Sequence, residues 1–166
     1  EFRRVLFRSN TAPASGVSLP ATGHAGETPE AGAVFRLPGR QGEVASDSLR
    51  GRVVVLDFWA SWCEPCRRSF PWLGSLQKKY GGRGLTVIGI NLDKKRPAAD
   101  AFLARFDAPF PVAFDPAGKT AESYRVAAMP TTIVLDREGR VIRRHAGFDP
   151  ARTAEFETFL EEVLAR

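Results

Sequence analysis

The sequence holds few of the side chains that build metal centres or disulfide frameworks: its 166 residues include two cysteines and two histidines. A structural zinc ion takes four Cys or His ligands, so all four of these residues would have to meet at one site. His24 lies in a low-complexity segment, and His145 lies far along the chain from Cys63 and Cys66. We therefore expect no metal site, and no cofactor of another kind.

Long hydrophobic runs and clustered basic residues are also lacking. No stretch approaches the roughly 18 consecutive apolar residues that indicate a membrane-spanning helix. The net charge of +5 is spread along the chain, whereas nucleic-acid-binding proteins concentrate basic residues in a stripe or a known motif. A composition of 43% hydrophobic and 26% charged residues is typical of one globular domain. We expect a monomer without a nucleic-acid partner.

The N-terminal region lacks large apolar side chains. Residues 10–30 are rich in Thr, Ala, Pro, Ser and Gly, and such a segment cannot bury enough surface to offset the entropy lost on ordering. We expect residues 1–30 to form a disordered tail or linker, and residues 31–166 to form the folded domain. The tail is either a linker that follows a membrane anchor or a plain disordered terminus.

The folded region alternates strand and helix patterns. The strongest strand pattern, at residues 52–59, is apolar on both faces, which is typical of a central strand in a covered sheet. The other expected elements are helices at 63–80, 97–106, 119–124 and 149–164, strands at 85–91 and 111–114, and hairpins at 33–45 and 131–145. This alternation predicts an α/β layer architecture.

The only two cysteines, Cys63 and Cys66, stand three residues apart directly after the strongest strand. Positions i and i+3 share one face of a helix, so the pair can form a disulfide at a helix end. Cys63 would lie at the helix N-terminus, where unpaired N–H groups favour a thiolate. We expect Cys63 to attack a substrate disulfide and Cys66 to resolve the mixed disulfide. A purely structural bridge is the alternative, although so short a loop would constrain the unfolded chain little.

Two segments carry a family resemblance: residues 55–66, VLDFWASWCEPC, and residues 129–139, MPTTIVLDREG. They resemble the thioredoxin superfamily and, within it, the TlpA/ResA-like extracytoplasmic thiol–disulfide oxidoreductases. The expected hairpin at 33–45 and the helix and strand at 97–114 are similar to that branch's N-terminal hairpin and central insert. The resemblance covers residues 31–166. It implies a thioredoxin fold, a central mixed β-sheet flanked by helices, with an N-terminal β-hairpin and a central α/β insert.

The resemblance also implies a docking surface around the cysteines. The Met129–Pro130 peptide bond is expected to be cis and to face Cys63, where Pro130 would help to bind an extended substrate strand. Only about 5–6% of X–Pro bonds in folded proteins are cis, so composition alone does not predict this geometry. The residues expected to contact a substrate are Trp62, Glu64, Pro65 and Met129.

Two positions depart from the family pattern. Many relatives have Glu three residues after the second cysteine, where this chain has Ser69, and many have Asn where this chain has Asp57. Asp57 instead matches the buried aspartate of ordinary thioredoxins. A buried carboxylate has a raised pKa and could accept the proton of Cys66. The alternative is that Asp57 is a solvated or hydrogen-bonded residue at a strand end.

The resemblance implies a thiol–disulfide oxidoreductase that reduces disulfides of exported proteins, such as apocytochrome c or a copper-site cysteine pair. It would work in the bacterial periplasm or on the outer face of the membrane, where a missing N-terminal segment could anchor it and a membrane electron donor would reduce it again. The charge of Glu64 disfavours the Cys63 thiolate, whereas Arg67 and Arg68 favour it. A thiolate that is little stabilised makes a reductant or an isomerase partner rather than a primary oxidant.

Two other functions stay open. A peroxiredoxin-like peroxidase would need Thr three residues before the reactive cysteine, where this chain has Ala60. A non-catalytic thioredoxin-fold module that binds extended peptides would need no dithiol. Peroxide consumption would identify the first, and full biological activity of a Cys63→Ala variant would identify the second.

Residues 1–9 generate a prediction of their own, because they can be back-translated into a string that resembles a common sequencing adapter. We interpret these residues as translated adapter sequence and leave them out of the fold. Resequencing of the source locus should return different DNA at this position. Native DNA that encodes the same nine residues with other codons would contradict the interpretation.

Overall fold

Strand β4 (Val53–Trp59) is the centre of the structure, and each of its residues is buried. It pairs in parallel with β5 (Leu85–Asn91) on one side and antiparallel with β7 (Thr131–Leu135) on the other. A strand that is buried on both faces requires covering layers on both sides of the sheet. The apolar pattern at residues 52–59 therefore predicted this strand correctly.

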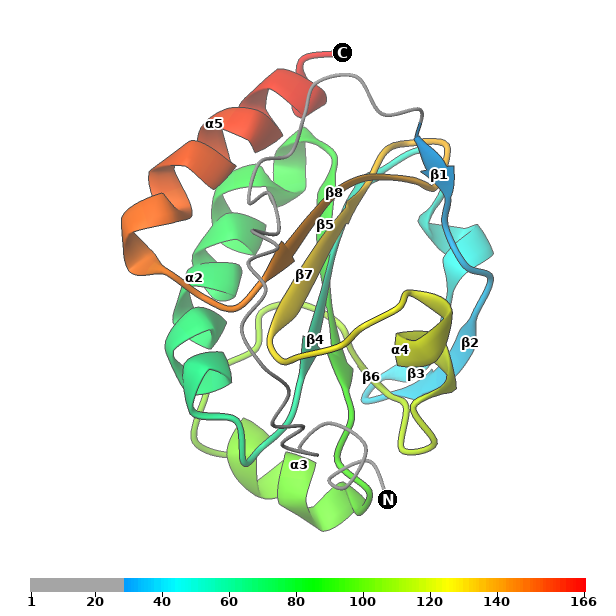
Figure 1. The fold of residues 1–166 in the computed structure, drawn as a ribbon, viewed down its shortest axis with the longest axis vertical. Coiled ribbons are helices and arrows are strands. Elements are labelled where there is room, and N and C mark those ends of the chain that lie inside the picture. Colours follow the sequence, from blue (N-terminus) through cyan, green and yellow to red (C-terminus); the bar gives the residue numbers. More distant parts are fainter. Residues whose placement is uncertain (1–28) are drawn as a thin grey trace, which may run out of the picture.

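The computed structural model describes residues 29–166 as one mixed sheet with helices on both sides (Figure 1). The strand order is β1-β8-β7-β4-β5-β6-β2-β3. The remaining strands are β1 (Glu30–Ala31), β2 (Arg36–Gly39), β3 (Gly42–Ala45), β6 (Val112–Phe114) and β8 (Arg140–Ala146). The tail expected at residues 1–30 lies outside the described residues except for its last two, and Glu30 pairs with Val141.

Alternate side chains of β4 enter two different cores. Val53, Val55 and Trp59 pack beneath α2 (Glu64–Tyr80), α3 (Arg96–Leu103) and α5 (Thr153–Leu164). Val54, Leu56 and Phe58 pack on the opposite face, which α4 (Lys119–Ser123) and the segment before β2 cover. Figure 1 shows α2 and α5 side by side on one side of the sheet and α4 on the other. The two-residue period of a strand produces this division.

An aromatic cluster attaches α2 and α3 to the end of β4. The ring of Trp59 lies 5.0 Å from that of Phe70 and 4.7 Å from that of Phe102, between ring centroids. Phe110 extends the cluster, at 5.3 Å from Phe70. The cluster packs the last residue of β4 against the middle of α2 and against α3.

Several boundaries differ from the expected ones. The first long helix begins at Glu64 because Cys63 has an extended backbone (φ −87°, ψ 108°), and it continues through Pro71. The expected start of the last helix is a 3₁₀ turn, η3 (Pro150–Arg152), and the Asp149 side chain accepts a hydrogen bond from the Ala151 N–H, as expected for a cap. The N-terminal hairpin pairs residues 36–39 with 42–45, so it begins three residues after the expected start at residue 33.

No helix among residues 29–166 combines the length and the apolar character that a membrane crossing requires.

The aromatic cluster generates a stability prediction. Phe70 is fully buried, so Phe70→Ala should lower the free energy of unfolding by about 3–5 kcal/mol, the usual cost of removing a buried ring. Trp62 is 48% exposed, so Trp62→Ala should change the stability by less than about 1 kcal/mol. Urea unfolding of both variants tests this difference. Equal losses in the two variants would show that Phe70 does not fix α2.

Candidate active site

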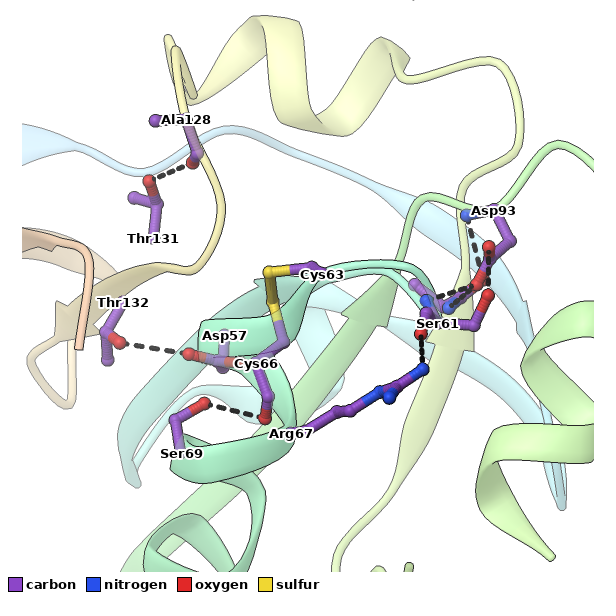
Figure 2. Close-up of a disulfide and its surroundings, with 11 residues drawn as sticks. Asp57, Ser61, Cys63, Cys66, Arg67, Ser69, Asp93, Ala128, Thr131 and Thr132 are labelled. Atoms are coloured by element: carbon purple, nitrogen blue, oxygen red, sulfur yellow. Dashed lines mark hydrogen bonds between the residues drawn. A yellow bond between two sulfur atoms is a disulfide. The ribbon is translucent and has the colours of Figure 1, made fainter. Parts of the chain in front are cut away.

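Cys63 and Cys66 form a disulfide at the start of α2, with their Cα atoms 5.3 Å apart (Figure 2). Cys63 is the N-cap residue of the helix, and Cys66 lies in its first turn. Cys63 is 4% exposed and Cys66 is 0% exposed. Both cysteines are therefore buried in the oxidised protein, and the residue at the helix terminus is the more accessible of the two.

The helix N-terminus favours a negative charge on Cys63. No side chain caps the first turn, and Pro65 stands at its beginning without an N–H to satisfy. The N–H groups of the first turn have no partners within the helix, and their partial positive charges stabilise a thiolate placed at the N-cap. Reduction of the disulfide would therefore yield a nucleophile at Cys63 rather than at Cys66.

The charged residues beside the disulfide largely compensate one another. The guanidinium of Arg67 lies 3.4 Å from the carboxylate of Glu64, and both side chains are exposed. Arg67 also donates a hydrogen bond to the Ser61 carbonyl at 3.5 Å, and Arg68 is exposed to solvent. Because Glu64 has a cation beside it and water screens exposed pairs, its effect on the Cys63 thiolate is smaller than its position in the sequence suggested.

The segment before β7 has the geometry that the resemblance implied. The Met129–Pro130 peptide bond is cis, and Pro130 is buried. Met129 packs against the core cluster that contains both cysteines. The Gly147 N–H donates a hydrogen bond to the Pro130 carbonyl at 2.8 Å, which ties the segment to the end of β8. Together with the half-exposed Trp62, this segment provides an apolar surface next to the dithiol.

Asp57 is fully buried, which excludes a solvated carboxylate and leaves the buried acid–base group and the hydrogen-bonded residue as the two interpretations. Its Oδ1 accepts a hydrogen bond from the Thr132 hydroxyl at 3.0 Å (Figure 2). Its Oδ2 has no partner among the described residues. Burial raises the pKa of Asp57 from 3.8 to about 7, although the hydrogen bond from Thr132 lowers it in part. A carboxyl group with such a pKa can gain or lose a proton near neutrality.

Asp57 lies on the same face of β4 as the helix that carries the cysteines. Val55 and Trp59, two residues before and after it, pack against Cys66 and the interior of α2. Ser69 stands where many relatives have a glutamate. It is buried, and its hydroxyl donates a hydrogen bond to the Cys66 carbonyl at 3.1 Å. Because a serine hydroxyl does not titrate near neutrality, Ser69 cannot take over the acid–base chemistry of a glutamate at this position.

A buried polar network that was not predicted from the sequence holds the loop between β4 and α2. Asp93 accepts hydrogen bonds from the Ser61 N–H at 2.9 Å and the Ser61 hydroxyl at 2.7 Å. The Asn91 amide donates to the same carboxylate at 2.7 Å. Because β4 and β5 are parallel, their carboxyl ends meet at one edge of the sheet. A polar residue directly after the second strand was the available signal.

Thr132 lies in the segment at residues 129–139 that resembles the family, but its sequence position predicted no functional role. The antiparallel register places it opposite Asp57, and only the assembled sheet reveals this pairing.

Within residues 29–166, no group of three or more His, Cys, Asp or Glu side chains is placed to hold a metal ion.

Comparison with known proteins gives consistent results. The family described as Redoxin matches residues 16–160. The thiol-disulfide oxidoreductase ResA of Bacillus cereus is 34% identical over 115 residues, which are 69% of this chain and 65% of ResA. The chain therefore spans slightly less than two thirds of the length of that relative.

Solved structures share the fold. A crystal structure from Chlorobium tepidum, described as a thiol:disulfide interchange protein DsbE, is 45% identical, with a TM-score of 0.81, and the match covers 83% of this chain and 98% of that one. The exposed lipoprotein thioredoxin Etrx1 of Streptococcus pneumoniae is 29% identical, with a TM-score of 0.70 over 78% of this chain and 99% of that one. The expected thioredoxin fold is confirmed.

The burial of Asp57 generates a prediction about pH. The folded state holds the Asp57 proton up to about pH 7, whereas the unfolded chain loses it near pH 3.8. Between these values the folded state binds more protons, so stability falls as the pH rises. Asp57→Asn removes this penalty and should be more stable than the parent at pH 8, by up to about 4 kcal/mol, with a smaller gain at pH 5.

Urea unfolding of the oxidised protein at several pH values measures this difference. Asp107→Asn is the matched control, because the Asp107 side chain is 80% exposed and its replacement should change little at any pH. If the stability curves of Asp57→Asn and the parent run parallel from pH 4 to pH 8, Asp57 does not titrate as described.

Proposed function

This chain belongs to the Redoxin family and is a TlpA/ResA-like member of the thioredoxin superfamily, and from that membership we propose that it is a thiol–disulfide oxidoreductase. The observation that carries the proposal is the disulfide between Cys63 and Cys66, formed at a helix N-terminus on the face of β4 that holds the buried carboxyl group of Asp57. Each part has a chemical role in disulfide exchange.

The reduced protein would act in two steps. The Cys63 thiolate attacks one sulfur of a substrate disulfide, forms a mixed disulfide and releases the first substrate thiolate. The Cys66 thiol then loses its proton to Asp57, and the resulting thiolate attacks the Cys63 sulfur. The second substrate thiolate leaves, both substrate sulfurs are reduced, and the protein ends with the disulfide seen in the structure.

Substrate binding is proposed for the apolar surface around the dithiol. An extended peptide would lie between Trp62 and the cis-proline segment at Met129 and Pro130, and Glu64 and Pro65 would contact it at the helix start. The exposure of Trp62, 48% for a large aromatic side chain, supports this assignment, because exposed aromatic residues are typical of protein-binding surfaces.

The substrates would be disulfide-containing proteins outside the cytoplasm, and the protein would act on them as a monomeric reductant. The name of one relative, thiol-disulfide oxidoreductase ResA, supports disulfide-containing substrates, and the name of another, an exposed lipoprotein thioredoxin, supports a location outside the cytoplasm. A reductant in that compartment needs a membrane electron donor for its own reduction. A missing N-terminal segment would anchor the protein if it is tethered.

Cysteine variants test the proposal with insulin as the disulfide substrate and dithiothreitol as the electron source. Cys63→Ser should show no turnover above the uncatalysed rate, because it removes the nucleophile. Cys66→Ser should attack but fail to resolve, so a mixed disulfide with insulin should accumulate and be visible by mass spectrometry. Ser69→Ala, which changes a buried hydroxyl in the same helix, is the matched control and should keep turnover.

Two results would contradict the proposal. Turnover by Cys63→Ser at the parent rate would show that the dithiol is not the reacting group. Peroxide consumption by the parent protein at the rate of disulfide reduction would favour a peroxidase, although the residue three positions before Cys63 is Ala60 rather than the threonine that orients peroxide.

A further inference from the structure

Three polar side chains, Asp57, Thr132 and His145, form a row across neighbouring strands. The register places Asp57 of β4 opposite Thr132 of β7, and Thr132 opposite His145 of β8. Residues directly opposite in antiparallel strands point to the same face, with Cβ atoms roughly 4.5–5.5 Å apart. The polar row therefore runs along the α2 face of the sheet, from a fully buried carboxyl group to a half-buried imidazole.

A small cavity lies at the outer end of the polar row. Thr132 and His145 both line it, together with Trp72 of α2 and Phe156 of α5. Its volume is about 20 Å³, and a water molecule needs roughly 10–15 Å³ by the same measure. The cavity that Thr132 and His145 line is therefore large enough for one water molecule.

A proton on Asp57 needs a polar route to solvent. The neighbours of Asp57 on the same face of β4, Val55 and Trp59, are apolar and belong to the closed core under α2. Its hydrogen bond within the described residues is the one from Thr132. A proton taken from Cys66 cannot pass to water through that apolar core, whereas a hydroxyl accepts one proton and donates another.

We propose that His145 is a positioning residue that carries the proton of Asp57 between the buried carboxyl group and solvent, by way of the Thr132 hydroxyl. This inference rests on the proposed function, because the proton enters the row only when Cys66 becomes a thiolate. It adds to that function a defined exit for the proton, at the cavity beside the end of β8.

The proton is conserved at each step. Asp57 takes the proton of Cys66 and, as a carboxylic acid, donates it to the Thr132 oxygen. The hydroxyl proton of Thr132 passes outward to a nitrogen of His145, directly or through the water in the cavity. The imidazolium then releases a proton to solvent, and the Thr132 hydroxyl, which now carries the proton from Asp57, donates again to the Asp57 carboxylate as it does in the structure. No electrons move in these steps.

The charges around His145 suit a proton acceptor. The positive charges that act on His145 are those of Arg143 in β8 and Arg152 in η3. The negative charges that act on it are those of Glu155 in α5 and of Asp149. Burial and the two arginines lower the pKa of His145, while the two acids oppose them. The ring is therefore neutral near pH 7 and can accept a proton from Asp57, whose pKa is about 7. The groups that face Asp57 are Cys66 from α2 and Thr132 from β7.

The test follows the two chemical steps separately with 5,5′-dithiobis(2-nitrobenzoate) as the disulfide. The reduced full-length protein should release thionitrobenzoate in a first phase, when Cys63 attacks, and in a second phase, when Cys66 resolves the mixed disulfide. His145→Gln should slow the second phase about tenfold near pH 7, and leave the first phase unchanged. The difference should shrink as the pH rises and hydroxide takes over deprotonation of Cys66.

Three further variants separate a relay from a structural effect. Added imidazole should restore the second phase in His145→Ala. Thr132→Ser should keep the parent rate, and Thr132→Val should lose it. Thr153→Ala is the control for a disturbed cavity, because Thr153 lines the same cavity and its hydroxyl donates to the Pro150 carbonyl; it should leave both phases unchanged.

The outcomes are distinguishable. A His145→Gln variant with the parent's second phase at every pH would overturn the relay, and so would a slowing that is uniform with pH and that imidazole does not relieve. A parent protein that releases no second thionitrobenzoate would instead overturn the proposed function, and the relay with it.

Discussion

Burial of β4 on both faces is the constraint on which the rest of the structure depends. A strand of seven buried residues needs a helical layer on each side, so α2 must begin where β4 ends and must return along the strand. The turn that joins them contains Ser61 and Trp62, and the network around Asp93 fixes it. The dithiol at the helix start is therefore held by the most buried part of the molecule rather than by a free loop.

The same burial raises the free-energy cost of ionising the Asp57 carboxyl group. Asp57 occupies a position on the inner face of β4 where its neighbours are Val55 and Trp59, and it has one hydrogen bond and an unpartnered oxygen. An ionised carboxylate at this place costs about 4 kcal/mol, the free energy that corresponds to its raised pKa. Groups of this kind are concentrated at functional sites, where a proton must be gained and lost near neutrality. Deprotonation of Cys66 is the proposed step that uses such a carboxyl group.

The parts that could be predicted from sequence are those with local signals. The apolar run of β4 and the spacing of Cys63 and Cys66 each lie within a few residues, and the structure confirms the strand and the disulfide. The cis bond at Pro130 followed from the family resemblance alone, because composition carries no such signal. The helix start moved by one residue, since the extended backbone of Cys63 makes it a cap rather than a helical residue.

The other parts depend on register. Thr132 and His145 take on their relation to Asp57 only when β7 pairs with β4 and β8 pairs with β7, and no local pattern determines those pairings. The charge around the dithiol also differs from the expectation based on sequence, because the ion pair between Glu64 and Arg67 weakens the effect of Glu64 on the Cys63 thiolate. An i, i+3 pair of opposite charges is visible in the sequence, so this compensation could have been anticipated.

The reduction potential of the Cys63–Cys66 couple tests the central claim most directly, and equilibration of the full-length protein with a thiol buffer measures it. Each ~30 mV corresponds to ~1.4 kcal/mol in the balance between dithiol and disulfide. The account predicts a value at or below about −230 mV, that of a reductant whose Cys63 thiolate is stabilised by the helix terminus without an added net charge from the paired Glu64 and Arg67. A value near about −120 mV would mean a strongly stabilised Cys63 thiolate, and the protein would then be an oxidant rather than a reductant.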